Sequence, residues 1–174
     1  MKKFELTTEF ITNMFGKKLF RIKALVEFGN VKAGELGGYV EKEENVSQDG
    51  NAWVSGDARV YGDAEVSGNA WVYGDAWVSG NAWVYGNAWV SGNARVSSDA
   101  DYALVQGFGT EFRCTTFYRG KNKKIMVNCG CFHGDLEGFR KQVKETRNGK
   151  IAKEYLMIAD LMEYHFTSED SSNE

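Results

Sequence analysis

The sequence of 174 residues contains no proline, only two histidines and three cysteines. Two histidines are too few for a catalytic zinc site that is held by three of them, so that chemistry is excluded. An odd number of cysteines favours reduced thiols in a cytosol over a framework of disulfide bonds. No apolar run approaches the length of a transmembrane helix, and the opening MKKFELTTEF has no apolar stretch behind its charges. We therefore expect a cytoplasmic protein with neither a signal peptide nor a membrane partner.

The net charge of −3 gives no general indication of nucleic-acid binding. Charge is uneven along the chain, however, because residues 113–153 hold eleven lysines and arginines against three acidic residues. Such a basic segment is either a solvated surface or a binding site for phosphate groups. It is too short, in a chain that is negative overall, to predict binding to duplex DNA. The acidic residues 168–174 are expected to be disordered.

The main feature that is present is a six-residue repeat, which runs without interruption through eight hexads from Gly50 to Ser97. Each hexad reads glycine, asparagine or aspartate, alanine, a variable residue, valine, and serine or tyrosine. The alternation around the variable residue predicts a short strand with its alanine and valine on one face. Glycine followed by asparagine or aspartate predicts a turn, because these residues tolerate positive φ. One such strand cannot bury its own apolar face, so we expect the hexads to wind into stacked coils.

This pattern resembles the repeat of the hexapeptide-repeat proteins, which form left-handed parallel β-helices. The resemblance implies three hexads per coil, so that residues 18 apart lie above one another. It also implies a homotrimer, the common assembly of such proteins. The columns of small and aliphatic residues extend beyond the perfect hexads and place the β-helix at residues 38–103. The predicted fold is therefore mainly β: a left-handed parallel β-helix with a small C-terminal ββαα module.

Stacking of the coils predicts three ladders of variable side chains, one on each face of the β-helix. The first is a row of tryptophans that we expect to form the interface between subunits, with cover by the chain's own termini or stacking on a ligand as alternatives. The second is cationic and aromatic and is an alternative ligand-binding face, and the third is acidic. The first ladder is Trp53, Trp71 and Trp89, the second is Arg59, Trp77 and Arg95, and the third is Glu65, Trp83 and Asp101.

The segments on either side of the β-helix have different predicted roles. Residues 1–37 alternate well enough for strands and are expected to cap an open end of the β-helix. Residues 104–167 are predicted to form the ββαα module, with strands 111–119 and 125–133 joined by a basic turn. Asp135 is the predicted N-cap of the first helix. The second helix places the following residues near one face: Ile151, Tyr155, Ile158, Leu161, Met162 and Phe166.

The basic hairpin of this module carries the predicted ligand site. Arginine and lysine bind phosphate, aromatic rings stack on bases, and the free N–H groups at the start of a helix favour anions. All three features occur within a short stretch, although an Asp135 cap would already satisfy those N–H groups. The predicted ligand-binding residues are Tyr118, Arg119, Lys123, Lys124, Phe132, His133 and Gly134.

The stretch CGCFH allows two interpretations. Cys129, Cys131 and His133 share one side of the predicted strand, and Cys114 can face them from the paired strand, as a tetrahedral zinc site requires. Alternatively, the small cysteines fill the buried face of the hairpin. The spacing is not that of a zinc finger or zinc ribbon, and we predict neither a metal nor another cofactor.

The stretches KLFRIKAL, GELGGYVEKEENVSQDGNAWV and GCFHGDLEGFRKQVKET together resemble small proteins encoded by phages and prophages of Gram-positive bacteria. Some compact phage-encoded oligomers bind nucleotide signals of host immune enzymes. The resemblance thus implies a non-catalytic protein that sequesters a small phosphorylated, nucleotide-like ligand to blunt host defence. The alternatives are a rigid structural or virion-associated trimer and a hexapeptide-repeat acyltransferase. Acyltransferases of this kind use a histidine base on the coils, and the hexads contain none, so we predict no catalytic residue.

Overall fold

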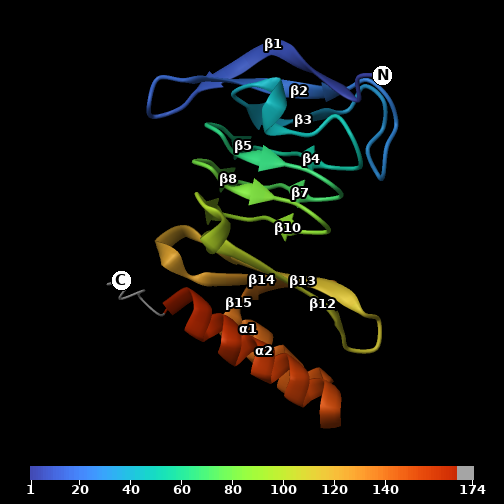
Figure 1. The fold of residues 1–174 in the computed structure, drawn as a ribbon, viewed down its shortest axis with the longest axis vertical. Coiled ribbons are helices and arrows are strands. Elements are labelled where there is room, and N and C mark those ends of the chain that lie inside the picture. The colour runs from blue at the N-terminus through green and yellow to red at the C-terminus, as the bar shows by residue number, and fades with distance from the viewer. Residues whose placement is uncertain (168–174) are drawn as a thin grey trace, which may run out of the picture.

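The computed structural model describes residues 1–167, and its layers follow one another along the long axis of the molecule (Figure 1). An N-terminal antiparallel hairpin comes first, then the stacked coils, then a four-stranded antiparallel sheet, and last two helices. The predicted fold class, mainly β with a parallel β-helix and a small C-terminal module, is confirmed. Residues 168–174, which are predicted to be disordered, lie outside the described residues.

Each hexad forms a two-residue strand, and strands 18 residues apart pair in parallel with the register that the sequence predicts. Trp71 pairs with Trp53 on one side and with Trp89 on the other. The backbone N–H of Trp71 donates to the carbonyl oxygen of Ala88 at 2.8 Å, one of a regular series of hydrogen bonds between coils. The strands are β4 (Trp53–Val54), β5 (Arg59–Val60), β6 (Glu65–Val66), β7 (Trp71–Val72), β8 (Trp77–Val78), β9 (Trp83–Val84), β10 (Trp89–Val90) and β11 (Arg95–Val96).

The alanines and valines of the hexads fill the interior of the β-helix. Every one of them is at most 1% exposed. Full burial of a valine side chain contributes about 1.5–3 kcal/mol, so the columns together form the main core of the protein. The turns depend on glycine: Gly74 has a φ of +72°, and a Cβ atom there would lie 3.0 Å from the backbone nitrogen of Gly92 in the next coil.

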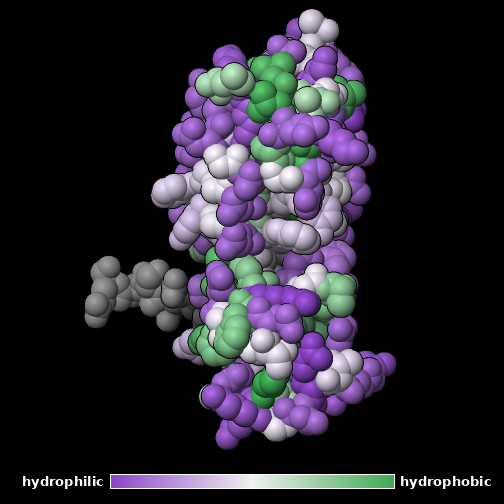
Figure 2. Space-filling model, turned by 90° about the vertical axis from the view of Figure 1, so that its right-hand side faces the viewer, coloured by the Kyte–Doolittle hydropathy of each residue, from purple (hydrophilic) through white to green (hydrophobic). Residues whose placement is uncertain are grey.

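The N-terminal strands extend one face of the β-helix. β1 (Phe4–Thr12) and β2 (Lys18–Ala24) form a hairpin, and β2 also pairs antiparallel with β3 (Leu36–Val40). β3 pairs in parallel with β5, so a single sheet runs in the order β1-β2-β3-β5-β8-β11. The other two faces are the shorter sheets β4-β7-β10 and β6-β9. On the side that faces right in Figure 1, the coils present mostly hydrophilic and intermediate residues, as Figure 2 shows.

The N-terminal segment covers the first coil and buries Trp53. The indole ring packs edge-on against Phe4 and Phe28, with ring centroids 6.2 and 5.4 Å away. Beside them, Lys3 Nζ donates hydrogen bonds to backbone carbonyl oxygens of this coil, the shortest to Ala52 at 2.9 Å. Burial lowers the pKa of Lys3 to about 8. The lysine thereby satisfies carbonyl groups that would otherwise be left unpaired at the open end.

The C-terminal module contains more strands than the predicted hairpin. After the 3₁₀ turn η2 (Asp99–Asp101), β12 (Tyr102–Phe108) and β13 (Arg113–Arg119) form an additional hairpin. The predicted strand 125–133 is interrupted at Gly130, where a φ of +60° allows a tight turn. The remaining elements are η1 (Glu43–Asn45), η3 (Lys121–Lys123), β14 (Ile125–Cys129), β15 (Phe132–Asp135), α1 (Leu136–Thr146) and α2 (Gly149–Thr167).

The four-stranded sheet of this module separates two hydrophobic cores. One face contributes Tyr102 and Tyr118 to the core of the β-helix and closes its second open end. The other face packs Phe117 and Val127 against α1 and α2. Leu161, which the sequence places on the buried face of α2, is exposed. Within the described residues, neither helix is long and apolar enough to cross a membrane.

Candidate functional site

The residues of the predicted ligand site do not form one surface, and Arg119 is the clearest case. Its Nε atom pairs with the Asp101 carboxylate at 3.0 Å, and its Nη2 atom donates to the carbonyl oxygen of Phe166 at 2.9 Å. The guanidinium group thus ties the sheet to the end of the β-helix and to α2, which corrects its predicted role in phosphate binding. Asp101 also leaves the predicted acidic ladder, because its carboxylate accepts a hydrogen bond from the backbone N–H of Ser97 at 2.8 Å.

Tyr118 and His133 belong to a polar network between the sheet and the last coil. Tyr118 is fully buried with its hydroxyl group 3.1 Å from Ser91 Oγ, and burial raises its pKa to about 12. Asn128 Nδ2 donates to the carbonyl oxygen of Trp89 at 2.7 Å, and Asn128 Oδ1 lies 2.6 Å from His133 Nδ1. These bonds hold the sheet against the β-helix. Tyr118 is therefore a structural residue and not the exposed stacking residue that the sequence predicts.

The predicted anion site at the start of α1 is already filled. Asp135 caps the helix as predicted, since its carboxylate accepts a hydrogen bond from the backbone N–H of Gly138 at 2.9 Å. Lys124 Nζ lies 3.5 Å from the same carboxylate. Lys123 is exposed on the basic turn and has no ion pair within residues 1–167. Gly134 thus precedes a helix in which one carboxylate engages the N–H group of Gly138 and the neighbouring cation of Lys124.

The alternative ligand face is assembled as predicted, but its central ring is covered. Trp77 lies between Arg59 and Arg95, whose guanidinium carbons are 5.1 and 4.2 Å from the ring centroid. One arginine comes from the preceding coil and one from the next, so a cation contacts each face of the indole. Arg95 also donates to the carbonyl oxygen of Asp75 at 3.0 Å, and burial lowers its pKa. Within residues 1–167, Trp77 is thus already in contact with two cations of the protein itself.

The tryptophan ladder is formed, but its members differ in exposure. Trp53 is 0% exposed beneath the N-terminal segment, so the prediction that it forms a subunit interface is corrected. Trp89 is 42% exposed at the other end of the ladder, and Trp71 is intermediate. The rings of Trp71 and Trp89 pack edge to face with their centroids 5.9 Å apart. Cover by the chain's own terminus applies to the first coil and leaves Trp89 available.

The cysteines are not arranged around a metal ion. Cys129 packs against the core on the helix side of the sheet, whereas His133 is bonded to Asn128 on the side of the β-helix. Cys114 is partly buried, and burial raises the pKa of its thiol. In residues 1–167 no group of three or more histidine, cysteine, aspartate or glutamate side chains is placed to hold a metal ion.

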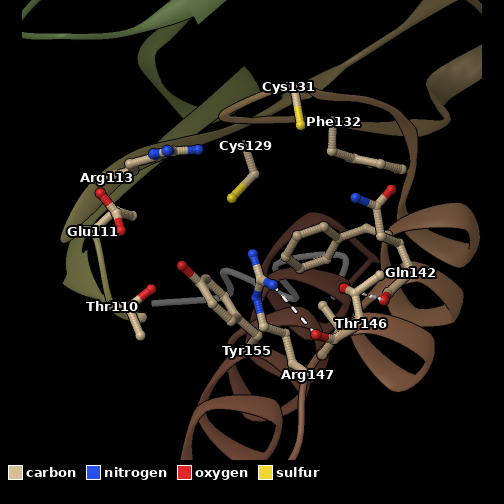
Figure 3. Close-up of a pocket in the computed structure, with 13 residues that line it drawn as sticks. Thr110, Glu111, Arg113, Cys129, Cys131, Phe132, Gln142, Thr146, Arg147 and Tyr155 are labelled. Carbon is tan, nitrogen blue, oxygen red and sulfur yellow. Dashed lines mark hydrogen bonds between the residues drawn. The ribbon is translucent and has the colours of Figure 1, made fainter.

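A different set of residues surrounds a cleft between the sheet and the two helices (Figure 3). Arg113 begins β13, Arg147 follows α1, and both reach this cleft together with Tyr155 of α2. The cleft volume is about 70 Å³, enough for a few water molecules or one phosphate group and too small for a whole nucleotide. Of the predicted ligand-binding residues, Phe132 lines it. Further lining residues are Thr110, Glu111, Cys129, Gln142 and Thr146.

Two guanidinium groups dominate the electrostatics of the cleft. Neither Arg113 nor Arg147 forms an ion pair with a carboxylate of the described residues. Arg113, Arg147, Cys129 and Tyr155 all line the cleft. Burial and the nearby Cys129 raise the pKa of Tyr155, while the two arginines act in the opposite direction. Glu111 lies at the rim near Arg113 without forming an ion pair (Figure 3). Unpaired guanidinium groups at a partly enclosed site favour an anionic ligand.

Sequence reasoning missed this cleft because its arginines lie on separate elements. Arg113 and Arg147 both belong to the basic segment 113–153, but no local motif connects the start of β13 with the residue after α1. The signal available in the sequence is the excess of basic residues in that segment. It indicates an anion site without indicating which cations share it.

Comparison with known proteins supports the repeat. Residues 64–80 and 76–92 match the family described as YdcK Beta solenoid repeat, and both segments lie within the coils. No curated protein shows a significant match to the chain. The family match and the stacked coils agree that this is a protein with a β-solenoid repeat.

Proposed function

We propose that this protein is a non-catalytic binding protein that sequesters a small phosphorylated ligand, held by its phosphate group in the cleft between the sheet and the helices. The observation that carries the proposal is the convergence of Arg113 and Arg147 on this cleft without an ion pair to any carboxylate of residues 1–167. Arginine binds phosphate through parallel N–H donors, and such charge-assisted hydrogen bonds are strong. Thr110 and Gln142 add neutral polar groups to the same cleft.

The positions of the two histidines favour binding over catalysis. Neither of them lines the cleft. His133 is anchored by Asn128, and His165 packs against Phe166 with ring centroids 4.9 Å apart. An acyltransferase of the hexapeptide-repeat kind needs a histidine base on its coils, and the hexads have none.

The resemblance to phage-encoded proteins favours a nucleotide signal of host defence as the ligand. The place of action is then the cytoplasm of the bacterial host. The small volume of the cleft suits such a ligand if its phosphate enters and the remainder extends past the rim. Inorganic phosphate, ADP-ribose and cyclic di-AMP are therefore informative probes, because all three contain phosphate and differ in the groups attached to it.

Removal of both guanidinium groups should abolish this binding. Charge-assisted hydrogen bonds contribute about 1.5–3 kcal/mol each, so we expect Arg113→Ala with Arg147→Ala to weaken the affinity for the bound probe by about 100-fold or more. Glu111→Gln should strengthen binding, because it removes a negative charge from the rim. Isothermal titration calorimetry measures both effects.

A matched control is provided by Lys123→Ala with Lys124→Ala. It removes the same net charge from the exposed basic turn, outside the cleft. We expect this control to change the affinity little. Equal loss of binding in the two double variants would indicate a general charge effect, and full binding by the double arginine variant would contradict the proposed site.

A rigid homotrimer with a structural role is the second candidate. The observation that favours it is an exposed aromatic pair on the β-helix: Trp83 and Tyr85 are 50% and 51% exposed, with ring centroids 5.1 Å apart. Burial of such a pair between subunits removes apolar surface from water. We expect static light scattering at micromolar concentration to give the mass of a trimer. A monomer under these conditions would remove the structural candidate.

A further inference from the structure

The face of the β-helix formed by β4, β7 and β10 carries a row of asparagines beside its tryptophans. Asn51, Asn69 and Asn87 occupy the same position in successive coils, and all three are exposed. Asn51 Nδ2 donates to Asn69 Oδ1 at 3.0 Å, and Asn69 Nδ2 donates to Asn87 Oδ1 at 3.2 Å. A side-chain amide has two donor hydrogens and can accept two hydrogen bonds. The row is therefore ordered and still has hydrogen-bonding capacity for a ligand.

A groove of about 200 Å³ lies over this row. Its lining consists of the three asparagines together with Trp71, Trp89 and the loop around Asn30 that connects β2 with β3. The residues of the described chain, 1–167, that line this groove are all uncharged. A second hollow of about 260 Å³ shares Asn87 and Trp89 with the first and is also lined by Arg113, so a cation lies where the groove continues towards the C-terminal sheet.

The chemistry of the lining selects one class of ligand. Amides donate to and accept from hydroxyl groups, and the partly exposed indole of Trp89 offers a flat apolar surface. A sugar ring has hydroxyl groups around its edge and C–H bonds on its faces, so it matches both. Among residues 1–167, no cation lines the part of the groove over the asparagines, so a phosphorylated ligand would not be neutralised there. The repetition of the same groups from coil to coil also suits a polymer of repeating units.

We propose that this groove binds a neutral oligosaccharide, with one sugar ring against Trp89 and its hydroxyl groups hydrogen-bonded to Asn69 and Asn87. The groove over the asparagines shares no lining residue with the phosphate cleft, although Arg113 lines both that cleft and the adjoining hollow. Its ligand is held by neutral hydrogen bonds and ring contacts, whereas the ligand of the cleft is held by charge.

Titration with chitotetraose, maltotetraose and cellotetraose tests the proposal, with tryptophan fluorescence and calorimetry as readouts. We expect saturable binding of at least one of these neutral probes at millimolar or lower concentration. Trp89→Ala and Asn69→Ala should each weaken it by about tenfold or more, because each removes a group that contacts the sugar. Trp83→Ala and Asn81→Ala are matched controls that remove the same exposed residue types from another face, and they should leave the affinity unchanged.

Three outcomes would overturn the proposal. The first is that none of the three probes binds to the wild-type protein. The second is equal weakening by the control variants. The third is an oligomer in light scattering that Trp89→Ala dissociates and Trp83→Ala does not, which would make the groove an interface between copies of the chain. Arg147→Ala keeps the two sites distinguishable, since it should reduce binding of the phosphate probes and retain oligosaccharide binding.

Discussion

Val78→Asp should leave the protein without a cooperative unfolding transition or prevent its soluble expression. Val78 is fully buried and pairs with Val60 in the preceding coil and Val96 in the next. A carboxylate at this position would be an unpaired charge in an apolar column, at a cost of several kcal/mol. That is a large part of the 5–15 kcal/mol by which domains are typically stable. Circular dichroism during a thermal scan measures the effect.

The control for this substitution is Asn81→Asp. It introduces the same carboxylate a few residues later, on an exposed turn. Surface substitutions of this kind usually change stability by no more than about 0.5 kcal/mol. A soluble Val78→Asp protein with the melting temperature of the control would mean that Val78 does not point into the interior.

Trp53→Ala should destabilise the protein by about 3–5 kcal/mol, the usual cost of truncating a large aromatic side chain in a core. The indole is fully buried, and its loss would leave a cavity between the first coil and the rings of Phe4 and Phe28. The N-terminal segment would then lose an apolar contact with the β-helix and keep the pairing of β3 with β5. Urea denaturation followed by circular dichroism gives the change in the free energy of unfolding.

Trp89→Ala is the matched comparison, because the hexads that contain Trp53 and Trp89 both read GNAWVS. Trp89 is 42% exposed, so its truncation removes much less buried surface. We expect a loss of about 1 kcal/mol or less for this variant. Comparable losses for the two variants would show that the N-terminal segment does not cover Trp53 in solution.

The repeat made the β-helix predictable from the sequence. Alanine and valine recur at fixed positions, and a coil can bury them only by stacking on another coil with the same spacing. The pairing of Trp71 with Trp53 and Trp89 follows from that spacing together with the three hexads per coil that the resemblance to hexapeptide-repeat proteins implies. The Asp135 cap was predictable for a similar reason, since an N-cap acts on N–H groups only a few residues away.

The tertiary structure decided which of the repeated side chains are available. Identical GNAWVS hexads give a buried Trp53 and an exposed Trp89, because the N-terminal segment packs on one end of the ladder only. In the same way, Arg119 is engaged by Asp101, although the sequence gives no sign that the two are neighbours. The difference between these tryptophans lies entirely in contacts with distant segments.

The candidate site depends on the tertiary structure most of all. Arg113 and Arg147 reach one cleft because the sheet turns back at Gly130 and α1 packs across it. The position of that turn also separates Cys129 from His133, which the sequence places on one side of a single strand. The repeated hexad is enough to predict a coil, because each coil packs against other coils with the same sequence pattern. The cleft lies between strands and helices of different sequence. The contacts that bring these elements together do not recur along the chain, so no repeated pattern predicts them.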